Sequence, residues 1–387
     1  MKQILWISGR IPSPLYSGDA LYSAGLLEAL VTTRQVAVHV FGTQRDGHRS
    51  DDKLFDLPGV TSSMVRPASG IGLGSLLSSL PRDAYKLASA SFRKDLSDIL
   101  DKKWDWIVID HANSAGVLDM LKDRRVPICY IAHNAEGLVR PMIAREFEGL
   151  ARRAVMRLDA EKYRRLERQI VGLADAVICI TSDDASYFRR FSGNVHVIPP
   201  VYLGPVSPRR TIVDACPRAL VLVGSFEWAA KQRNLQQILD GLVPTLRRNG
   251  INLQVVGVVP KAIRARHEGD SSVTFHGRLP DVRPLFDTCR GGLVPEVLGG
   301  GFKLKILDYA FAGLPIFGLR PALTGMAPEE HSAMFEAENL SGLGDLLVRN
   351  IDDLGALNAS QIELQSLAAQ RFGLAAGIER MSRVFLR

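Results

Sequence analysis

The sequence predicts an α/β protein built from two doubly wound domains, each with a parallel sheet covered by helices. Its 387 residues are enough for two domains of ordinary size. Continuous apolar runs alternate with helical stretches in both halves, which is typical of parallel sheets buried on both faces. A proline-rich irregular stretch from Pro199 to Pro217 separates the halves. We therefore expect a first domain at 1–198, a linker at 199–217 and a second domain at 218–370.

The first half contains six apolar runs that we interpret as strands. They are Ile4–Ile7, Val36–Phe41, Trp106–Ile109, Ile128–Ile131, Val177–Ile180 and Val195–Ile198. A helix is expected at Ala20–Val31, after a long loop that ends in Gly18 and Asp19. Because doubly wound sheets bind ligands beyond the carboxyl ends of their strands, Gly18 and Asp19 are expected at the edge of a site.

Two further strands of this half end in polar residues at the same edge. Asp110 and His111 end one of them, and His133, Asn134 and Glu136 follow the other. A single histidine in such a place is more often a hydrogen-bonded structural residue. Two histidines at one sheet edge favour a site, and His133 is the stronger candidate of the pair.

The segment Arg140–Arg168 is strongly basic, with nine Lys or Arg residues against five Asp or Glu. Its apolar residues recur at roughly helical spacing, in the sets Phe147, Leu150, Ala154, Leu158 and Tyr163, Leu166, Ile170, Leu173. We expect an amphipathic helix with one basic face. This face is either solvated or in contact with an anionic membrane surface or a lipid-linked acceptor. Nucleic acid is a poorer partner, because no aromatic residues interleave with the basic ones.

The second half repeats the α/β pattern, starting from a buried strand that ends in Gly224 and Ser225. Small residues at a strand end allow a phosphate to approach, and Lys231 or Arg233 would neutralise its charge. The alternative is that these basic residues are ordinary exposed loop residues. Further strands are expected at Leu253–Val258 and Val273–Arg278.

The stretch from Gly299 to Gly318 has the clearest ligand-binding pattern. Three glycines, Gly299–Gly301, permit a sharp turn and a close approach to a ligand. A helix with buried Ile306, Leu307, Ala310 and Phe311 is expected to follow, then Gly313 and a short strand.

The first turn of this expected helix suits a diphosphate with a neighbouring sugar. Lys303 and Lys305 would add cationic donors to the free N–H groups of the helix N-terminus, and Asp308 would accept a sugar hydroxyl. The alternative is a surface loop with solvated lysines. The pattern is neither a P-loop, because Gly-Lys-Ser/Thr is missing, nor a Gly-x-Gly-x-x-Gly dinucleotide fingerprint.

The sequence GGFKLKILDYAFAGLPI, from Gly300 to Ile316, resembles the donor-binding signature of GT-B glycosyltransferases of family four. The resemblance implies two Rossmann-like domains that face each other across a cleft, and a C-terminal helix at 371–387 that crosses back to the first domain. It implies a nucleoside-diphosphate sugar as donor, uridine or guanosine diphosphate being the expected nucleotide. It implies no metal ion and no further cofactor.

Further segments are similar to the same family: Gly-Ser-x-x-Trp after the strand at Ala219, His-Gly-Arg-Leu-Pro-Asp at His276, and His-Asn-x-Glu at His133. The donor-binding residues expected from the motifs and the resemblance are Gly18, Asp19, Gly224, Ser225, Lys231, Arg233, Arg278, Gly300, Gly301, Phe302, Lys303, Lys305 and Asp308. His111, Asn134 and Glu136 are expected on the acceptor side, and His133, Asp308 and Lys305 are the catalytic candidates.

The sequence also departs from the family pattern. The family's Glu-x7-Glu motif would place a glutamate at the position of Gly300, and its second acidic residue is here Asp308. Glu296 is close by but out of register. The roles of the individual acidic residues are therefore open.

The predicted function is the transfer of a sugar from a nucleoside diphosphate to an acceptor hydroxyl with retention, as in polysaccharide biosynthesis. The acceptor would be a glycan, a lipid-linked glycan or a small metabolite. A nucleotide-sugar 2-epimerase of the same fold and a catalytically degenerate nucleotide-sugar-binding protein are the alternatives. Four scattered cysteines and the absence of a long apolar run favour a cytoplasmic protein, with peripheral contact to the inner face of the membrane as a variant.

Overall fold

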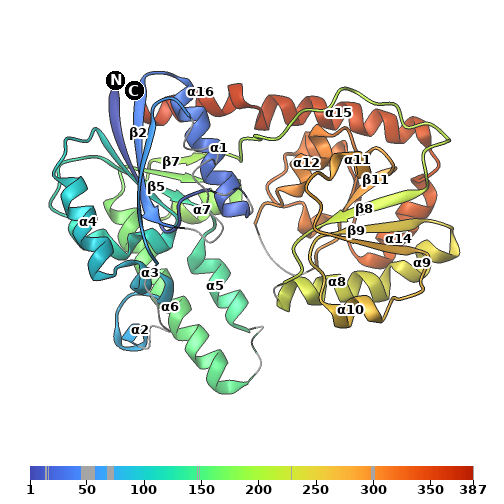
Figure 1. Ribbon diagram of the computed structural model, residues 1–387, viewed down its shortest axis with the longest axis horizontal. Helices are drawn as coiled ribbons and strands as arrows, with labels where there is room; N and C mark the ends of the chain where they lie inside the picture. Colours follow the sequence, from blue (N-terminus) through green and yellow to red (C-terminus); the bar gives the residue numbers. More distant parts are fainter. Residues whose placement is uncertain are drawn as a thin grey trace. The chain divides into compact units, whose positions relative to one another are not determined.

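A computed structural model describes residues 1–387 apart from 14, 16, 45–56, 68–73, 146, 148, 228, 298–300, 387 and the side chains of 229 and 230. The chain forms two compact units (Figure 1). Unit 1 consists of Met1–Leu203 and Leu374–Arg387, and unit 2 of Gly204–Gly373. The stretch 199–217, expected as a linker, is thus divided between the units at Leu203.

Unit 1 is built on a seven-stranded sheet of order β3-β2-β1-β4-β5-β6-β7, in which all neighbours are parallel. Its strands are β1 (Lys2–Ser8), β2 (Val36–Thr43), β3 (Val60–Val65), β4 (Trp106–Asp110), β5 (Ile128–Ala132), β6 (Ala176–Cys179) and β7 (Val195–Val197). The central strands β1, β4, β5 and β6 are almost entirely buried, which explains their continuous apolar sequence.

Helices cover both faces of this sheet. They are α1 (Gly18–Thr32), α2 (Gly74–Leu77), α3 (Arg82–Leu87), α4 (Ala90–Leu100), the 3-10 helix η2 (Ala112–Met120), α5 (Glu136–Arg145), α6 (Leu150–Leu173), α7 (Ser182–Phe188) and α16 (Leu374–Phe385). Ser89 and Thr181 cap α4 and α7 through their side chains. Among the described residues, no helix is both long and apolar enough to span a bilayer.

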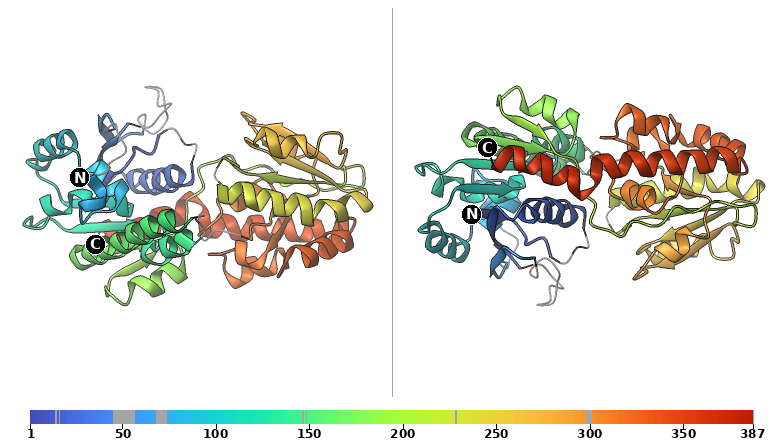
Figure 2. Two further views of the ribbon diagram at one scale, coloured as in Figure 1. Left: turned by 90° about the horizontal axis from the view of Figure 1, so that it is seen from below. Right: turned by 90° about the horizontal axis from the view of Figure 1, so that it is seen from above.

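The C-terminal helix α16 packs against α1 within unit 1 (Figure 2). Gly377 makes this close approach possible, because a Cβ there would lie 2.5 Å from Val201 and 3.2 Å from Ala29. Phe385 near the end of α16 is fully buried and meets Trp106 edge-on. The last helix is therefore part of the core of unit 1.

Unit 2 contains a six-stranded parallel sheet of order β10-β9-β8-β11-β12-β13. Its strands are β8 (Ala219–Val223), β9 (Asn252–Val256), β10 (Val273–Gly277), β11 (Gly291–Val294), β12 (Ile316–Leu319) and β13 (Phe335–Ala337). Its helices are α8 (Ala229–Gly241), α9 (Val243–Arg248), α10 (Lys261–Ala265), α11 (Arg283–Phe286), α12 (Lys305–Phe311), η3 (Arg320–Ala322), α13 (Pro328–Ser332), α14 (Leu340–Asn350) and α15 (Leu354–Phe372).

The two parallel sheets confirm the predicted fold class. All six strands predicted in the first half are present within a few residues of the expected bounds. The strand β3 was not predicted, because its sequence VTSSMV is largely polar and only its two end residues are buried. An edge strand needs few apolar residues, so its pattern is weak.

The single amphipathic helix expected at 140–168 is wrong. The segment consists of α5 and α6, which pack on each other as a hairpin. The two apolar sets within it also have different environments. Tyr163, Leu166 and Ile170 are buried, whereas Leu150 and Leu158 are exposed.

Candidate functional site

In unit 1, polar residues meet at the carboxyl ends of β1, β4 and β5. The strands β1 and β4 are neighbours. From β1 the strands follow in the order β2, β3 towards one edge of the sheet, and from β4 in the order β5, β6, β7 towards the other. This topological switch point is where open α/β sheets bind ligands. Ser8 pairs with Asp110, and Asp110 with Ile131. His133, two residues beyond Ile131, therefore lies beside Asp110.

His133 is bound by a buried carboxylate that the sequence analysis did not nominate. Its Nε2 lies 2.7 Å from Oδ1 of Asp110 and 3.4 Å from Oγ of Ser23, and Nε1 of Trp6 donates to Oδ2 of Asp110 at 2.9 Å. Burial acts to raise the pKa of Asp110, but the charge and hydrogen bond of His133, with Ser23 and Trp6, hold this pKa below its usual value. An ionised Asp110 makes Nε2 of His133 the donor, so Nδ1 is the ring nitrogen left for a ligand.

His111 lies next to His133 in a strained backbone conformation. Its φ is +71°, a region that few residues other than glycine adopt and that is often found at functional sites. The two imidazole rings meet edge-on with centroids 5.1 Å apart. The structure thus brings together the two histidines predicted at this sheet edge.

Glu136 is a carboxylate shared between two cationic groups. Its Oε1 lies 3.4 Å from Nε2 of His111, and its Oε2 accepts a hydrogen bond from Nε of Arg140 at 2.5 Å. Burial acts to raise the pKa of Glu136, but His111 and Arg140 bring it down to about 2. Burial lowers the pKa of His111, and Glu136 more than reverses this, so that its pKa is raised. Arg140 therefore balances the negative charge of Glu136, and the imidazole of His111 is a further partner of this carboxylate.

A second buried carboxylate fixes the start of α5. Glu167, on α6, accepts the backbone N–H groups of Glu136 and Gly137, each at 2.9 Å. It thereby caps α5 from a neighbouring helix. Burial raises the pKa of Glu167 to about 7. Through this cap, α6 positions Glu136 and Arg140 at the sheet edge.

The other residues predicted in unit 1 lie around this group. Gly18 and Asp19 are exposed at the start of α1, which follows β1 across the same edge. Asn134 is half-buried and directly follows His133. Their roles stay predictions.

In unit 2, a glycine stands at the carboxyl end of each of the strands β8, β9 and β10. Gly224, Gly257 and Gly277 end these neighbouring strands, and the latter two have φ values of +128° and +69°. A Cβ on Gly257 would lie only 1.7 Å from the carbonyl oxygen of Gly224. No side chain fits at Gly257, because the Gly224 carbonyl and the Phe226 ring already fill the space beside it, whereas, among the described residues, nothing lies within 4 Å of a Cβ built on Gly277.

Three lysines and one glutamate gather beyond β11. Lys305 forms an ion pair with Oε1 of Glu296, whose Oε2 is buried without a hydrogen-bond partner among the described residues. Nζ of Lys303 donates to the carbonyl oxygen of Gly301 at 3.1 Å. Burial lowers the pKa of Lys303 to about 8, the charge of Glu296 opposes this, and Lys305 and Lys231 lower it further. The group, which we call the lysine cluster, has surplus positive charge and suits an anion.

The helix after the cluster is fixed to the sheet by Tyr309. Its hydroxyl accepts the N–H of Val223 at 2.9 Å and donates to the carbonyl oxygen of Val221 at 3.3 Å. Its ring lies against Gly292, where a Cβ would be 2.6 Å away. The predicted apolar positions Ile306, Leu307, Ala310 and Phe311 are all buried. This packing sets the orientation of Lys305 at the start of α12.

One part of the helix prediction is wrong. The helix begins at Lys305, so Lys303 lies outside its first turn. With only seven residues, α12 offers a short dipole. A candidate anion site here therefore rests on the lysine side chains more than on the helix N-terminus.

The remaining residues predicted in unit 2 have varied surroundings. Lys231, Arg233 and Arg278 are exposed, and Asp308 is half-buried on α12. The hydroxyl of Ser225 donates to Glu227 at 3.0 Å. The ring of Phe302 packs against Phe372, with centroids 5.4 Å apart. Gly301 has a φ of +76°, as a tight turn requires, and Gly300 lies outside the described residues.

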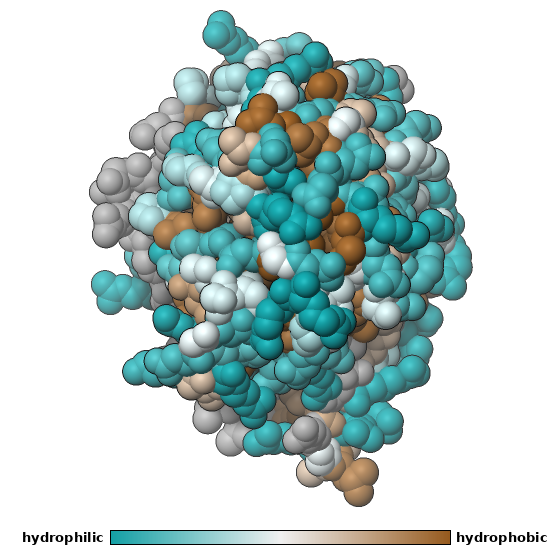
Figure 3. Space-filling view, turned by 90° about the vertical axis from the view of Figure 1, so that its right-hand side faces the viewer, coloured by the Kyte–Doolittle hydropathy of each residue, from teal (hydrophilic) through white to brown (hydrophobic). Residues whose placement is uncertain are grey.

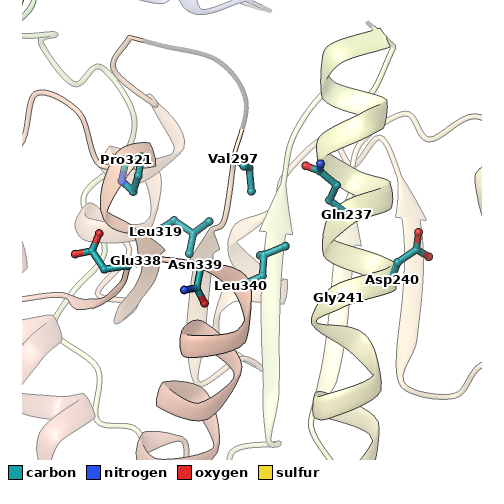
Figure 4. Close-up of a pocket in the computed structure, with 9 residues that line it drawn as sticks. All are labelled: Gln237, Asp240, Gly241, Val297, Leu319, Pro321, Glu338, Asn339 and Leu340. Carbon is teal, nitrogen blue, oxygen red and sulfur yellow. The ribbon is translucent and has the colours of Figure 1, made fainter.

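A hollow of about 580 Å³ lies beside the lysine cluster, between α8 and the start of α14 (Figure 4). It is lined by Gln237, Asp240, Gly241, Val297, Leu319, Pro321, Glu338, Asn339 and Leu340. Two of these residues are acidic and none is basic. The hollow therefore does not suit a diphosphate, and we place the anion site at the lysine cluster.

Several residues of the site escaped the sequence analysis. Asp110 could have been predicted from the sequence. It is the last residue of its strand, and in a parallel sheet this position lies beside the end of the neighbouring strand, which His133 follows. Asn234 is buried, and its Oδ1 accepts the N–H of Val297 at 3.2 Å, which holds the start of the glycine-rich stretch. Ser23, Trp6 and Arg140 approach the site only through the tertiary fold, and their sequence positions carry no signal for it.

Two family models match the chain, one in each half. Residues 17–201 match Glycosyltransferase Family 4, and residues 217–353 match Glycosyl transferases group 1. The fold and these matches define a glycosyltransferase of the GT-B class. More narrowly, the first half of the chain matches glycosyltransferases of family four and the second half those of group 1, as the resemblance of its glycine-rich stretch predicted.

Solved structures with a similar fold include Anabaena Alr3699/HepE in complex with UDP and glucose, with 14% identity, a TM-score of 0.67 and 99% of each chain covered. WaaG, a glycosyltransferase involved in lipopolysaccharide biosynthesis, has 15% identity, a TM-score of 0.67 and coverage of 98% of this chain and 99% of its own. The trehalose-6-phosphate synthase OtsA has 14% identity, a TM-score of 0.65 and coverage of 100% and 99%. At these levels of sequence identity, the similarity shows that the folds are alike and nothing more. No curated protein matches the sequence.

Proposed function

We propose that this glycosyltransferase transfers a hexosyl group from a nucleoside-diphosphate sugar to an acceptor hydroxyl with retention of configuration. The lysine cluster is the observation that supports a nucleoside-diphosphate sugar as the donor. Lys231, Lys303 and Lys305 lie together with Glu296 at the carboxyl edge of the unit 2 sheet. A diphosphate supplies the negative charge that this group lacks.

The chemistry needs stabilisation of the departing diphosphate more than it needs a protein nucleophile. The bond between the anomeric carbon and the phosphate oxygen breaks, and its electron pair stays with the diphosphate. The acceptor oxygen bonds to the anomeric carbon, and its proton passes to the phosphate oxygen that has just left that carbon. In this proposal Lys305 and Lys303 stabilise the charge that develops on the leaving group. Asp308 and the buried Oε2 of Glu296 are then acceptors for sugar hydroxyl groups.

Unit 1 supplies the groups for the sugar and the acceptor. His133, oriented by Asp110, offers Nδ1 to a hydroxyl group. His111, Asn134 and Glu136 extend this polar surface. Because its charges are paired, the surface suits an uncharged glycan, a lipid-linked glycan or a small metabolite.

A uridine nucleotide is the first donor to examine. HepE was solved with UDP, with UDP and glucose, and with UDP-glucose, and TarM of S. aureus with UDP and alpha-GlcNAc-glycerol. These ligands belong to those proteins, and they support UDP as the starting choice here. Guanosine diphosphate is the alternative. The backbone at Gly277, which has open space beside it, is where we expect the base.

The test is calorimetric titration with UDP, GDP, ADP and dTDP. One nucleotide should bind, and Lys305→Ala should weaken its binding at least about tenfold, as loss of a charge-assisted hydrogen bond predicts. Lys261→Ala removes an exposed lysine of α10 in the same unit and is the matched control. Equal affinity of Lys305→Ala and wild type would refute the assigned anion site.

The stereochemical outcome and the class of reaction need a separate measurement. Once a donor and an acceptor are found, NMR of the first product formed reports the anomeric configuration. Retention supports the proposal, and inversion contradicts it. Conversion of the nucleotide sugar without an acceptor into its 2-epimer, or its hydrolysis alone, would favour the epimerase alternative. His133→Ala should lower transfer and leave nucleotide affinity unchanged, since His133 lies in unit 1.

A further inference from the structure

The hairpin of α5 and α6 exposes a concentration of large apolar side chains. We define the hairpin tip as Leu138–Arg145 of α5 and Leu150–Leu158 of α6. Six of the nineteen exposed large apolar side chains among the described residues lie in it: Leu138, Met142, Ile143, Leu150, Val155 and Leu158. Leu150 alone is 85% exposed. An exposed apolar patch of this kind marks a contact surface.

The apolar residues of the tip do not continue the buried stripe of α6. Ala154 and Tyr163 are nine residues apart, which at about 100° per residue places them half a turn from each other. Tyr163 is fully buried, whereas Ala154 and its neighbours Leu150 and Leu158 are exposed. The apolar stripe of the tip therefore has no role in the core of unit 1.

The tip is nevertheless a well-formed element. The helices α5 and α6 pack along each other, and Ala144 of α5 is fully buried between them. Figure 1 shows the hairpin projecting from the sheet of unit 1. On the side of the molecule in Figure 3, by contrast, hydrophobic residues occur in small groups between hydrophilic ones.

Arginines flank the apolar stripe on both sides. On the wheel of α6, Arg157 lies about 20° before Leu150, and Arg152 about 60° beyond Val155. Both arginines are exposed, as is Arg145 at the end of α5. An apolar stripe between arginines is the pattern of helices that lie in a membrane interface, where the arginines meet lipid phosphates.

We propose that the hairpin tip docks unit 1 on a membrane surface that contains anionic lipids. Leu150, Val155 and Leu158 would enter the boundary between head groups and acyl chains, and the arginines would contact the phosphates. A nucleic acid would pair with the arginines but leave the leucines in water, so it fits the surface less well.

Docking would also hold the candidate site of unit 1 at a defined distance from the membrane surface. The helix α5 has ten residues, from Glu136, which contacts His111, to Arg145 in the tip. Ten helical residues span about 15 Å. A docked tip thus holds this sheet edge close to the membrane surface, where the head group of a lipid-linked acceptor would lie.

The test is co-flotation with vesicles of phosphatidylcholine, with and without phosphatidylglycerol, at low and at high salt. Wild type should float with the anionic vesicles at low salt. The double variant Leu150→Glu/Leu158→Glu should lose about tenfold in partition coefficient for each leucine. Ile362→Glu is the matched control, because Ile362 of unit 2 is 42% exposed and Leu158 is 47% exposed.

The arginines need a second pair of variants, because the chain has a net charge of +7. Arg152→Gln/Arg157→Gln should lower binding to anionic vesicles about fivefold for each arginine. Arg264→Gln/Arg266→Gln makes the same change in net charge in unit 2, at the exposed Arg264 of α10 and the exposed Arg266 directly after this helix, and should have little effect. Far-ultraviolet circular dichroism checks that every variant folds.

Three results would overturn the proposal. The first is that wild type does not float with anionic vesicles. The second is that the tip variants and their controls lose binding equally, which would mean that net charge alone attracts the protein. The third is that light scattering finds a wild-type dimer that Leu150→Glu/Leu158→Glu dissociates, without vesicle binding. The tip would then be an interface between copies. None of these measurements depends on sugar transfer.

Discussion

The lysine cluster predicts that diphosphate affinity depends on pH in a range where most lysines do not titrate. Burial and the neighbouring cations lower the pKa of Lys303 to about 8. A bound diphosphate would bring negative charge beside the ammonium group and raise its pKa. Binding should therefore take up protons, and affinity should fall as the pH rises through the pKa of the free protein.

The size of the effect follows from this pKa. With a value of about 8, Lys303 is about nine-tenths protonated at about pH 7 and about one-tenth protonated at about pH 9. If the ammonium group stays protonated in the complex, the affinity falls about tenfold between these two pH values. At about pH 8, binding should take up about half a proton.

Calorimetry in buffers with different ionisation enthalpies measures both quantities. Lys303→Met should bind the nucleotide more weakly at neutral pH and should lose the proton uptake. Lys261→Met, at an exposed site on α10, should behave like wild type. Glu296→Gln removes the negative charge that raises the pKa of Lys303, so the pH dependence should move to lower pH. Constant affinity and no proton uptake in wild type would show that Lys303 does not meet the diphosphate.

Two substitutions test the supports of the sites. Asp110→Asn leaves one acceptor oxygen for the two donors Trp6 and His133, so the rate of sugar transfer should fall about a hundredfold while nucleotide affinity is kept. An unchanged kcat would show that Asp110 is only structural. The control is Asp119→Asn, at the exposed ion pair with Arg93. Tyr309→Phe leaves the N–H of Val223 without its partner, so the free energy of unfolding should fall by about 1–3 kcal/mol. Denaturant titration measures this change, and an unchanged unfolding midpoint would contradict the role of Tyr309.

The fold was predictable because it depends on patterns that are local in sequence. Buried strands such as Trp106–Asp110 are continuous apolar runs, and the sequence from Lys305 to Gly313 has the periodicity and the terminal glycine of a helix. The hairpin of α5 and α6 shows the limit of this reasoning. Its exposed leucines have helical spacing just as the buried residues do, so periodicity alone placed both apolar sets in one amphipathic helix.

The site was predictable only in part. Residues that follow a strand, such as His133, or a glycine-rich turn, such as Lys305, are marked by their positions. Their partners are not marked in this way. Trp6 and Ser23 reach Asp110 from β1 and α1, and this contact depends on how the sheet and helices pack. The shift in the pKa of Lys303 has the same origin, because it depends on neighbours brought together by folding.

The two candidate sites differ in charge, and this difference supports the proposed division of roles. In unit 1 each carboxylate has a cationic or hydrogen-bonding partner: Asp110 has His133, and Glu136 has His111 and Arg140. In unit 2 Lys231, Lys303 and Lys305 lie with Glu296, and the pKa of Lys303 is lowered by burial first and then by the charges of Lys305 and Lys231. An uncharged hydroxyl needs directed hydrogen bonds without net charge, whereas a departing diphosphate needs positive charge arranged before it arrives. Each unit therefore has the electrostatic character that its proposed part of the reaction requires.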